Sequence, residues 1–143
     1  MADAYFKYKA GIGNAASYLV SGRPFITGSV GPLRPGFEQK VEFPLVTKRI
    51  SVIRHGAGAG VTDVMRVHFN STSSTIDVIS SSHYIELDSD EDTFEFNVKC
   101  KEIYISAPQA NAQNLNWRLY AELTQIDKGE MYDLTGVGLT SKT

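Results

Sequence analysis

Short runs in which apolar and polar residues alternate, separated by clusters of Gly, Pro, Ser and Asn, make up most of residues 24–125. A period of two residues places apolar side chains on one face of a strand and polar side chains on the other. In the run 117–125, the odd-numbered residues from Trp117 to Leu123 are apolar, and the even-numbered residues from Arg118 to Thr124 are predicted to face solvent. This pattern predicts short antiparallel strands with one wet face and one dry face.

Eight or nine strands are expected, from runs at residues 24–29, 39–46, 49–54, 63–70, 75–79, 83–87, 93–100, 102–106 and 117–125. No helical crossover separates them, which favours two packed antiparallel sheets over a parallel sheet. The apolar parity changes between Cys100 and Ile103, so we expect a bulge or tight turn near Lys101. The predicted fold is all-β: an antiparallel eight-stranded β-sandwich, with jelly-roll topology favoured by the strand count, and extended N- and C-terminal arms.

The 143 residues, 42% of them hydrophobic, are expected to form one domain with extensions. We expect an extended N-terminal arm at 1–22, the sandwich at 23–126 and a C-terminal tail at 127–143. Aromatic side chains of the arm lack a sustained period and have to be buried elsewhere, so an assembly interface is predicted at Tyr5, Phe6, Tyr8 and Tyr18. Tyr132 and Leu134 of the tail are added to this interface. For the tail, docking on a neighbour and terminal disorder both stay open.

Charge and cysteine content exclude several classes of protein. Lys and Arg total 14 against 16 Asp and Glu, so no field favours direct binding of nucleic acid. The single cysteine, Cys100, excludes an intrachain disulfide and a cysteine-based zinc site. Residues 1–8 lack the pattern of a signal peptide, and no run approaches the roughly 20 apolar residues of a membrane span. We therefore expect a soluble product, intracellular at synthesis, without membrane insertion.

Candidate metal sites are weak. The three histidines, His55, His68 and His83, do not match the His-x-His and later Glu and His typical of metal-binding cupins. His68 alternates with Val67 and Phe69, which predicts a solvent-facing side chain. The acidic run 88–92 lacks the glycine and distal glutamate of an EF-hand loop and is predicted to form a hairpin turn with solvated charges. No metal site is predicted.

The candidate catalytic and cofactor motifs also lack the pattern or the structural context that their chemistry needs. Residues 11–16 resemble a dinucleotide fingerprint but lack the preceding strand and following helix, and residues 28–31 do not form a nucleophile elbow. Cys100 lies on the apolar parity of its run, which predicts a buried structural thiol. No catalytic residue and no cofactor is predicted, and the chain is expected not to be an enzyme.

One basic surface is a candidate for ligand contact. Lys48, Arg49 and Arg54 could line one sheet face, with Arg66 and His68 nearby if the two strands pair. Such a patch suits a sugar acid, a phosphate or an acidic neighbour, but a solvated strand face is the preferred explanation.

Four segments give the chain a resemblance to a known group of proteins: GRPFITGS at 22–29, VEFPLVT at 41–47, RVHF at 66–69 and FNVKCKEIYI at 96–105. In their order and residue pattern, these segments resemble single jelly-roll virion structural proteins, such as penton and minor capsid proteins of large double-stranded DNA viruses, including algal viruses. Phage decoration proteins are a second group that they resemble. The resemblance covers most of residues 20–126 in pattern and contains no diagnostic motif.

The resemblance implies a non-enzymatic capsid protein in the virion, synthesised in the host cytoplasm. Its expected partners are copies of itself, as a pentamer or trimer, and other capsid proteins, with glycans as an additional candidate. A carbohydrate-binding module is the alternative, with Tyr84, Tyr104 or Tyr120 stacking on sugar rings. An enzyme on a jelly-roll scaffold is the third hypothesis.

Overall fold

A computed structural model describes residues 23–56, 63–72 and 78–140. These residues contain eight strands: β1 (Pro24–Gly28), β2 (Glu38–Glu42), β3 (Leu45–His55), β4 (Met65–His68), β5 (Ile85–Leu87), β6 (Thr93–Phe96), β7 (Glu102–Ser106) and β8 (Asn116–Asp127). One 3₁₀ turn, η1 (Lys128–Glu130), follows β8, and the described residues contain no α-helix. The predicted all-β class is confirmed.

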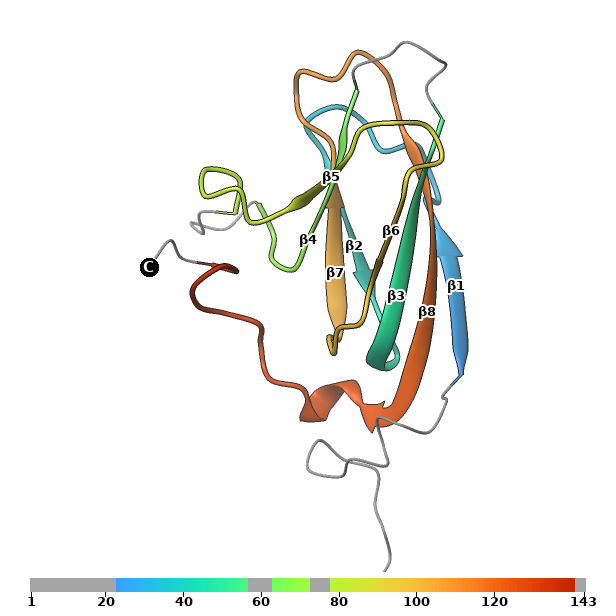
Figure 1. The fold of residues 1–143 in the computed structure, drawn as a ribbon, viewed down its shortest axis with the longest axis vertical. Helices are drawn as coiled ribbons and strands as arrows, with labels where there is room; N and C mark the ends of the chain where they lie inside the picture. Colours follow the sequence, from blue (N-terminus) through green and yellow to red (C-terminus); the bar gives the residue numbers. More distant parts are fainter. Residues whose placement is uncertain (1–22, 57–62, 73–77, 141–143) are drawn as a thin grey trace, which may run out of the picture.

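The strands form two four-stranded antiparallel sheets, with the orders β1-β8-β3-β6 and β2-β7-β4-β5 (Figure 1). Strands pair as 1 with 8, 2 with 7, 3 with 6 and 4 with 5, so the first half of the chain runs beside the second half. Further antiparallel pairs join β3 to β8 and β4 to β7. The prediction of an antiparallel eight-stranded β-sandwich is confirmed. Strands β1 and β6 are the edges of one sheet, and β2 and β5 are the edges of the other.

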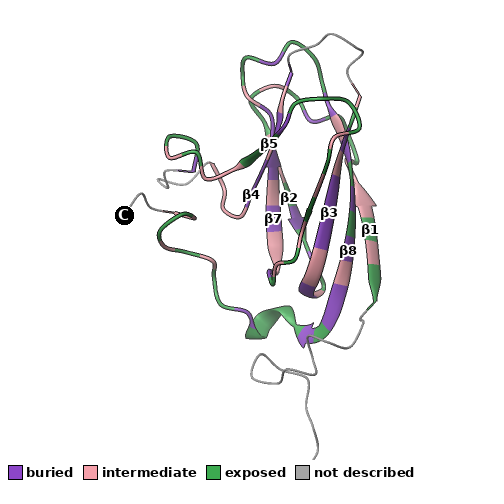
Figure 2. Ribbon diagram, in the orientation of Figure 1, coloured by how far each residue is buried: buried purple, intermediate pink, exposed green. Residues whose placement is uncertain are grey.

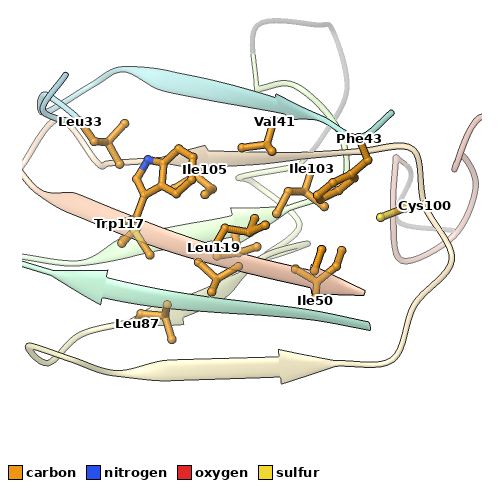
Figure 3. Close-up of a cluster of buried hydrophobic side chains, with 14 of the residues drawn as sticks. Leu33, Val41, Phe43, Ile50, Leu87, Cys100, Ile103, Ile105, Trp117 and Leu119 are labelled. Carbon is orange, nitrogen blue, oxygen red and sulfur yellow. The ribbon is translucent and has the colours of Figure 1, made fainter. Parts of the chain in front are cut away.

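The core lies between the sheets and is built by the inward-facing parity of each strand (Figures 2 and 3). Ile103 and Ile105 of β7 face Trp117 and Leu119 of β8, and none of the four is more than 3% exposed. The indole Nε1 of Trp117 donates a hydrogen bond across the core to Oε1 of Gln39, at 2.8 Å. A buried indole N–H needs such a partner, so this bond fixes the ring between the two sheets.

The chain changes sheets inside the run 39–46, which was predicted to be one strand. Strand β2 ends at Glu42 and pairs with β7, whereas β3 begins at Leu45 and pairs with β8. Between them Phe43 is fully buried, and Pro44 has no N–H to donate to a ladder. The single-strand prediction is wrong because periodicity cannot distinguish a straight strand from one that crosses to the opposite sheet.

Strand β6 is shorter than the predicted run 93–100 and stops at Phe96. Thr47 holds the segment that follows: its Oγ1 donates to the carbonyl oxygen of Val98 at 2.8 Å and accepts from the backbone N–H of Cys100 at 3.1 Å. This segment carries the chain from the β6 sheet to the β7 sheet. The change of parity near Lys101 reflects this change of sheet.

Strand β8 confirms the predicted buried face, since Trp117, Leu119, Ala121 and Leu123 are at most 3% exposed. Thr124 was predicted to face solvent but is fully buried. Its hydroxyl has hydrogen-bond partners there, because Oγ1 donates to the Val46 carbonyl at 2.7 Å and accepts from the Ile126 N–H. Ser51, on the polar parity of the alternating run 49–54, is also buried, at 6% exposed. It lies in register with the larger Tyr120 and Glu95 on its neighbouring strands.

Three other predicted segments differ or cannot be compared. The run 63–70 is reduced to β4, and the run 83–87 to the three residues of β5. Residues 75–77 of the run 75–79 lie outside the described residues, and Val78 and Ile79 lie in a turn. The N-terminal arm 1–22 also lies outside the described residues.

The tail contacts its own sandwich after η1. Met131 is buried with Val46 and Ile126, and Leu134 packs against both this cluster and the main core. The Leu134 carbonyl accepts a hydrogen bond from Asn70 Nδ2 at 2.9 Å. A salt bridge of 2.6 Å joins Lys101 to Asp133.

Replacing Ile103 by Ala should lower the free energy of unfolding by about 2–5 kcal/mol, because it leaves a cavity between the sheets. The matched control is Val137→Ala in the tail, where the side chain is 70% exposed and a change within about 0.5 kcal/mol is expected. Denaturant unfolding measures both. Equal effects at the two positions would contradict the assigned core.

Candidate functional site

The three histidines do not come together. His55 is exposed at the end of β3 in one sheet, His68 lies in β4 of the other sheet, and His83 lies in the turn before β5. Within residues 23–56, 63–72 and 78–140, no three His, Cys, Asp or Glu side chains form a group that could hold a metal ion.

His68 is 1% exposed, so the prediction of a solvent-facing side chain is wrong. It does lie on the outer face of its sheet, but the segment after β4 folds back over that face. Ser71 Oγ and the backbone N–H of Thr72 both donate to the carboxylate of Glu38 on β2, at 2.7 and 2.8 Å. The covering segment is therefore fastened to β2, on the far side of β7 from β4, and it removes the imidazole from water.

Both ring nitrogens of His68 have partners. Nδ1 lies 2.7 Å from the carbonyl oxygen of Asn70, which can only accept, so Nδ1 carries the proton. Nε2 therefore accepts from the hydroxyl of Ser106, at 2.8 Å. A serine that donates to a histidine in this way resembles the nucleophile and base of a hydrolase. Here Ser106 is 6% exposed, so the arrangement offers a substrate no access. The hydrogen bonds of His68 to Ser106 and Asn70 join β4 to β7 and to the covering segment.

Burial is the main influence on the pKa of His68 and lowers it below the usual 6.5. The Arg66 charge acts in the same direction, whereas the Asn70 carbonyl and the Glu38 carboxylate, 3.9 Å from Nε2, oppose the shift. The ring of Tyr104 stacks parallel to the imidazole, with centroids 6.1 Å apart. Neutral His68 is thus the form that the fold selects.

The basic residues that were considered as a patch do not come together. Strand β3, which carries Lys48, Arg49 and Arg54, and strand β4, which carries Arg66, belong to different sheets. Arg54 is 1% exposed and donates from an η nitrogen to the Asp63 carbonyl at 3.0 Å. The condition for a patch that includes Arg66 and His68, pairing of the two strands, is therefore not met.

The acidic segment 88–92 is a turn, but it is not a hairpin. It connects β5 of one sheet to β6 of the other. Asp92 accepts hydrogen bonds from the backbone N–H groups of Ser89 and Asp88, at 2.9 and 3.2 Å, and the Ser89 bond is the main cause that lowers the pKa of Asp92. Residues 88–91 are exposed, in agreement with the predicted solvated charges.

The three tyrosines considered for sugar stacking differ in their surroundings. The guanidinium carbon of Arg66 lies 4.3 Å from the ring centroid of Tyr84. Tyr104 stacks on His68, and the ammonium of Lys40 lies 5.8 Å from its ring centroid. Tyr120, as predicted, faces outward and is 36% exposed, beside Ile26 in the register of β1 and β8.

A groove of about 390 Å³ lies along the side of the sandwich where the edge strands β1 and β2 face each other. We call it the edge groove. Its floor is apolar, formed by half-buried Phe25 and by Val41 and Trp117, which are 6% and 3% exposed. Thr27 and Gly28 of β1 and Gln39, Lys40 and Glu42 of β2 complete the walls, with Val30 beyond β1.

Three exposed apolar side chains lie in the segment of the chain that runs beside the edge groove. Ile26 is 75% exposed, Val30 is fully exposed and Phe37 is 61% exposed, and all three lie in β1 or in the connection from β1 to β2. Such apolar exposure within twelve residues marks a surface suited to contact with another molecule.

On the opposite side of the sandwich, three phenylalanine rings pack over part of the core, and a pocket of about 240 Å³ lined by residues that include Val67, Phe69 and Ile85 lies beside them. Phe69, directly after β4, meets Phe96 of β6 edge to face, with ring centroids 5.9 Å apart. The ring centroids of Phe94 and Phe96 are 5.2 Å apart. These rings cover the core between β4 and β6, so the two sides of the sandwich differ.

The predicted assembly residues are only partly within the described part of the chain. Tyr5, Phe6, Tyr8 and Tyr18 lie outside it. Tyr132 is 66% exposed, whereas Leu134 is half-buried against the sandwich. Both line a second cavity of about 260 Å³ between the tail and the ends of β4 and β7.

Two features were missed by sequence reasoning. The periodicity identifies Val41 and Trp117 as inward-facing but carries no information on which strands become edges, so the edge groove has no local signal. The His68–Ser106 bond joins residues 38 positions apart, and neither residue belongs to a motif. A buried histidine could have been suspected only from the apolar residues that flank it.

No family model matches the sequence, and no curated protein matches it. No helix in the described part of the chain is long and apolar enough to cross a membrane.

Stability should fall as the pH decreases from about 7.5 to 5, because the unfolded chain binds a proton at the imidazole more tightly than the folded chain, in which the pKa of His68 is lowered. The stabilisation is complete above pH 6.5 and is lost as the pH falls towards the lowered value. Most carboxylates titrate below this window. His68→Gln should flatten the profile of unfolding free energy, and exposed His55→Gln should leave it unchanged. A profile unchanged by His68→Gln would contradict the assignment.

Cys100 is fully buried, as predicted, and burial raises the pKa of its thiol to about 11 against the opposing hydrogen bond from Thr47. The native protein should therefore react slowly with a thiol reagent at neutral pH, and the denatured protein should yield one thiol per chain. Thr93→Cys on the exposed face of β6 provides the control, since it adds a thiol that reacts at once. Rapid reaction of native Cys100 would show that the segment after β6 opens.

Proposed function

We propose that this chain is a non-enzymatic structural protein of a viral capsid, which assembles as a symmetric homo-oligomer in the virion and contacts other capsid proteins. The observation that carries the proposal is the open groove between the edge strands β1 and β2, together with the exposed apolar side chains on that part of the chain. The groove has an apolar floor and polar walls, and Ile26, Val30 and Phe37 are exposed in β1 and in the connection to β2.

The strand pairing supports a jelly roll. Pairs 1–8, 2–7, 3–6 and 4–5 correspond to a long hairpin wrapped over two sheets, and every connection except β4 to β5 crosses between the sheets. Jelly rolls of eight strands occur in viral capsid proteins, lectins and cupins. A jelly roll is compatible with a shell protein, a sugar-binding module and an enzyme, so the surfaces have to separate these candidates.

The polar centres support a non-enzymatic role. The pair His68 and Ser106 has hydrolase-like geometry but is buried beneath the segment 70–72. Arg54 is likewise buried and bonded to the backbone. In both cases a polar side chain satisfies a structural contact instead of facing a cavity that a substrate can enter. The open groove has an apolar floor, which suits a peptide segment.

Carbohydrate binding is the second candidate, and one observation favours it. Tyr120 and Ile26 form an exposed aromatic and aliphatic pair on the outer face of the β1-β8 sheet, on which a sugar ring can stack. The rings of Tyr84 and Tyr104 already contact Arg66, Lys40 and His68. A glycan array without binding would remove this candidate.

Light scattering coupled to size-exclusion chromatography tests the first candidate. The expected mass is a multiple of 15.7 kDa, corresponding to a trimer or pentamer, and electron microscopy should show the matching rotational order. Ile26→Asp should shift the chain towards monomer because it places a charge in the apolar border, and Gln125→Asp, at an exposed position of β8, should not.

A monomer at every concentration, with no particle in the presence of other capsid components, would overturn the proposal. So would a mass that Ile26→Asp leaves unchanged, because the exposed border would then have no part in assembly.

A further inference from the structure

We infer that the edge groove binds residues 4–10 of the N-terminal arm of a second copy, as an added β-strand. The inference rests on the proposed function, because it supplies the contact through which copies assemble. The described residues leave this groove open.

The groove offers backbone as well as apolar surface. Strand β1 has a partner only in β8, and β2 has a partner only in β7, among the described strands. Each therefore presents one unpaired row of N–H and C=O groups along the groove side. An extended segment that adds to such an edge gains main-chain hydrogen bonds, and alternate side chains enter the groove.

The arm contains one segment with a suitable pattern. In ADAYFKYKA at 2–10, the residues Ala4, Phe6, Tyr8 and Ala10 share one parity, and Tyr5, Lys7 and Lys9 share the other. As a strand, the segment would place Phe6 and Tyr8 on one face, spaced for two adjacent positions on the apolar floor. Lys7 and Lys9 would face water on the other side. Two aromatic rings of this size match a floor built from Phe25, Val41 and Trp117.

The length of the chain allows the arm to reach a neighbour. Twelve residues, 11–22, separate this segment from Arg23, where the description of the sandwich begins. Fully extended, twelve residues span about 40 Å, more than the length of β1 or β2. Glycines 11, 13 and 22 lie in this connection and permit it to change direction.

The exposed border of the groove favours a second copy over the chain's own arm. Ile26 and Phe37 are exposed beside the groove but are not part of its lining. An arm that fills the groove of its own chain would leave both side chains in water. A neighbour that supplies the arm brings its sandwich against the same side and covers them. Specific interfaces bury about 800 Å² per partner, so the inferred contact has to bury this border together with the arm.

Disulfide trapping between two distinguishable copies tests the inference on the full chain. One copy carries Ala4→Cys or Ala10→Cys in the arm, and the other carries Thr27→Cys in the groove wall, with different affinity tags. After co-expression and oxidation, a disulfide-linked heterodimer is expected. Native Cys100 is buried and serves as an internal blank, and Thr93→Cys on the opposite edge strand should not crosslink to the arm.

The outcomes separate this inference from the proposed function. Crosslinks that form only within a chain carrying both cysteines would overturn the second copy as the source. An oligomer without arm-to-groove crosslinks at either arm position would overturn the inference and leave the capsid proposal standing. A chain that is monomeric throughout would remove both.

Aromatic replacement gives an independent measure. The full-length double variant Phe6→Ser, Tyr8→Ser should raise the dissociation constant of the oligomer by about tenfold or more, as expected for buried aromatic anchors. The matched control, Lys7→Ser, Lys9→Ser, changes the opposite parity and should have a much smaller effect. Equal effects of the two double variants would overturn the proposed strand orientation.

Discussion

The structure depends on covering the apolar faces of two antiparallel sheets, each of which is amphipathic. Strands β3 and β8 form the centre of one sheet, and the bond from Trp117 to Gln39 ties this sheet to the edge strand of the other. Phe69, Phe94 and Phe96 cover part of the core on one side, and the edge groove lies between β1 and β2 on the other. Because exposed apolar surface favours association, the groove and the exposed side chains beside it are the part of the surface on which the proposed assembly rests.

How much of this the sequence predicts depends on the scale of the feature. Alternation correctly assigned the fold class and the inward faces of β7 and β8, because a strand half-buried in a sandwich repeats every two residues. It failed where the chain changes sheets, at Phe43 and after Phe96, and where a side chain on an outer face is covered, as for His68 and Thr124. These outcomes depend on strand order and on distant segments, which no local period contains.

The polar outer face of the second sheet and the edge groove have separate roles. The outer face of the second sheet carries salt bridges between its strands, and Glu38 and the buried His68 fasten the covering segment to it. The groove instead has an apolar floor and unpaired strand edges, and it lies beside the exposed border of Ile26 and Phe37. The polar face is thus stabilised within one chain, whereas we propose that a second copy covers the groove side.

Hydrogen exchange of the assembled full-length protein tests this account most directly. With the native arm, the edge strands β1 and β2 should exchange slowly, and the full-length variant Phe6→Ser, Tyr8→Ser should lose that protection while the central strands β3 and β8 keep theirs. Identical exchange of β1 and β2 in the two proteins, at concentrations where the native chain is assembled, would contradict the claim that the open side of the sandwich is completed by the arm of a second copy.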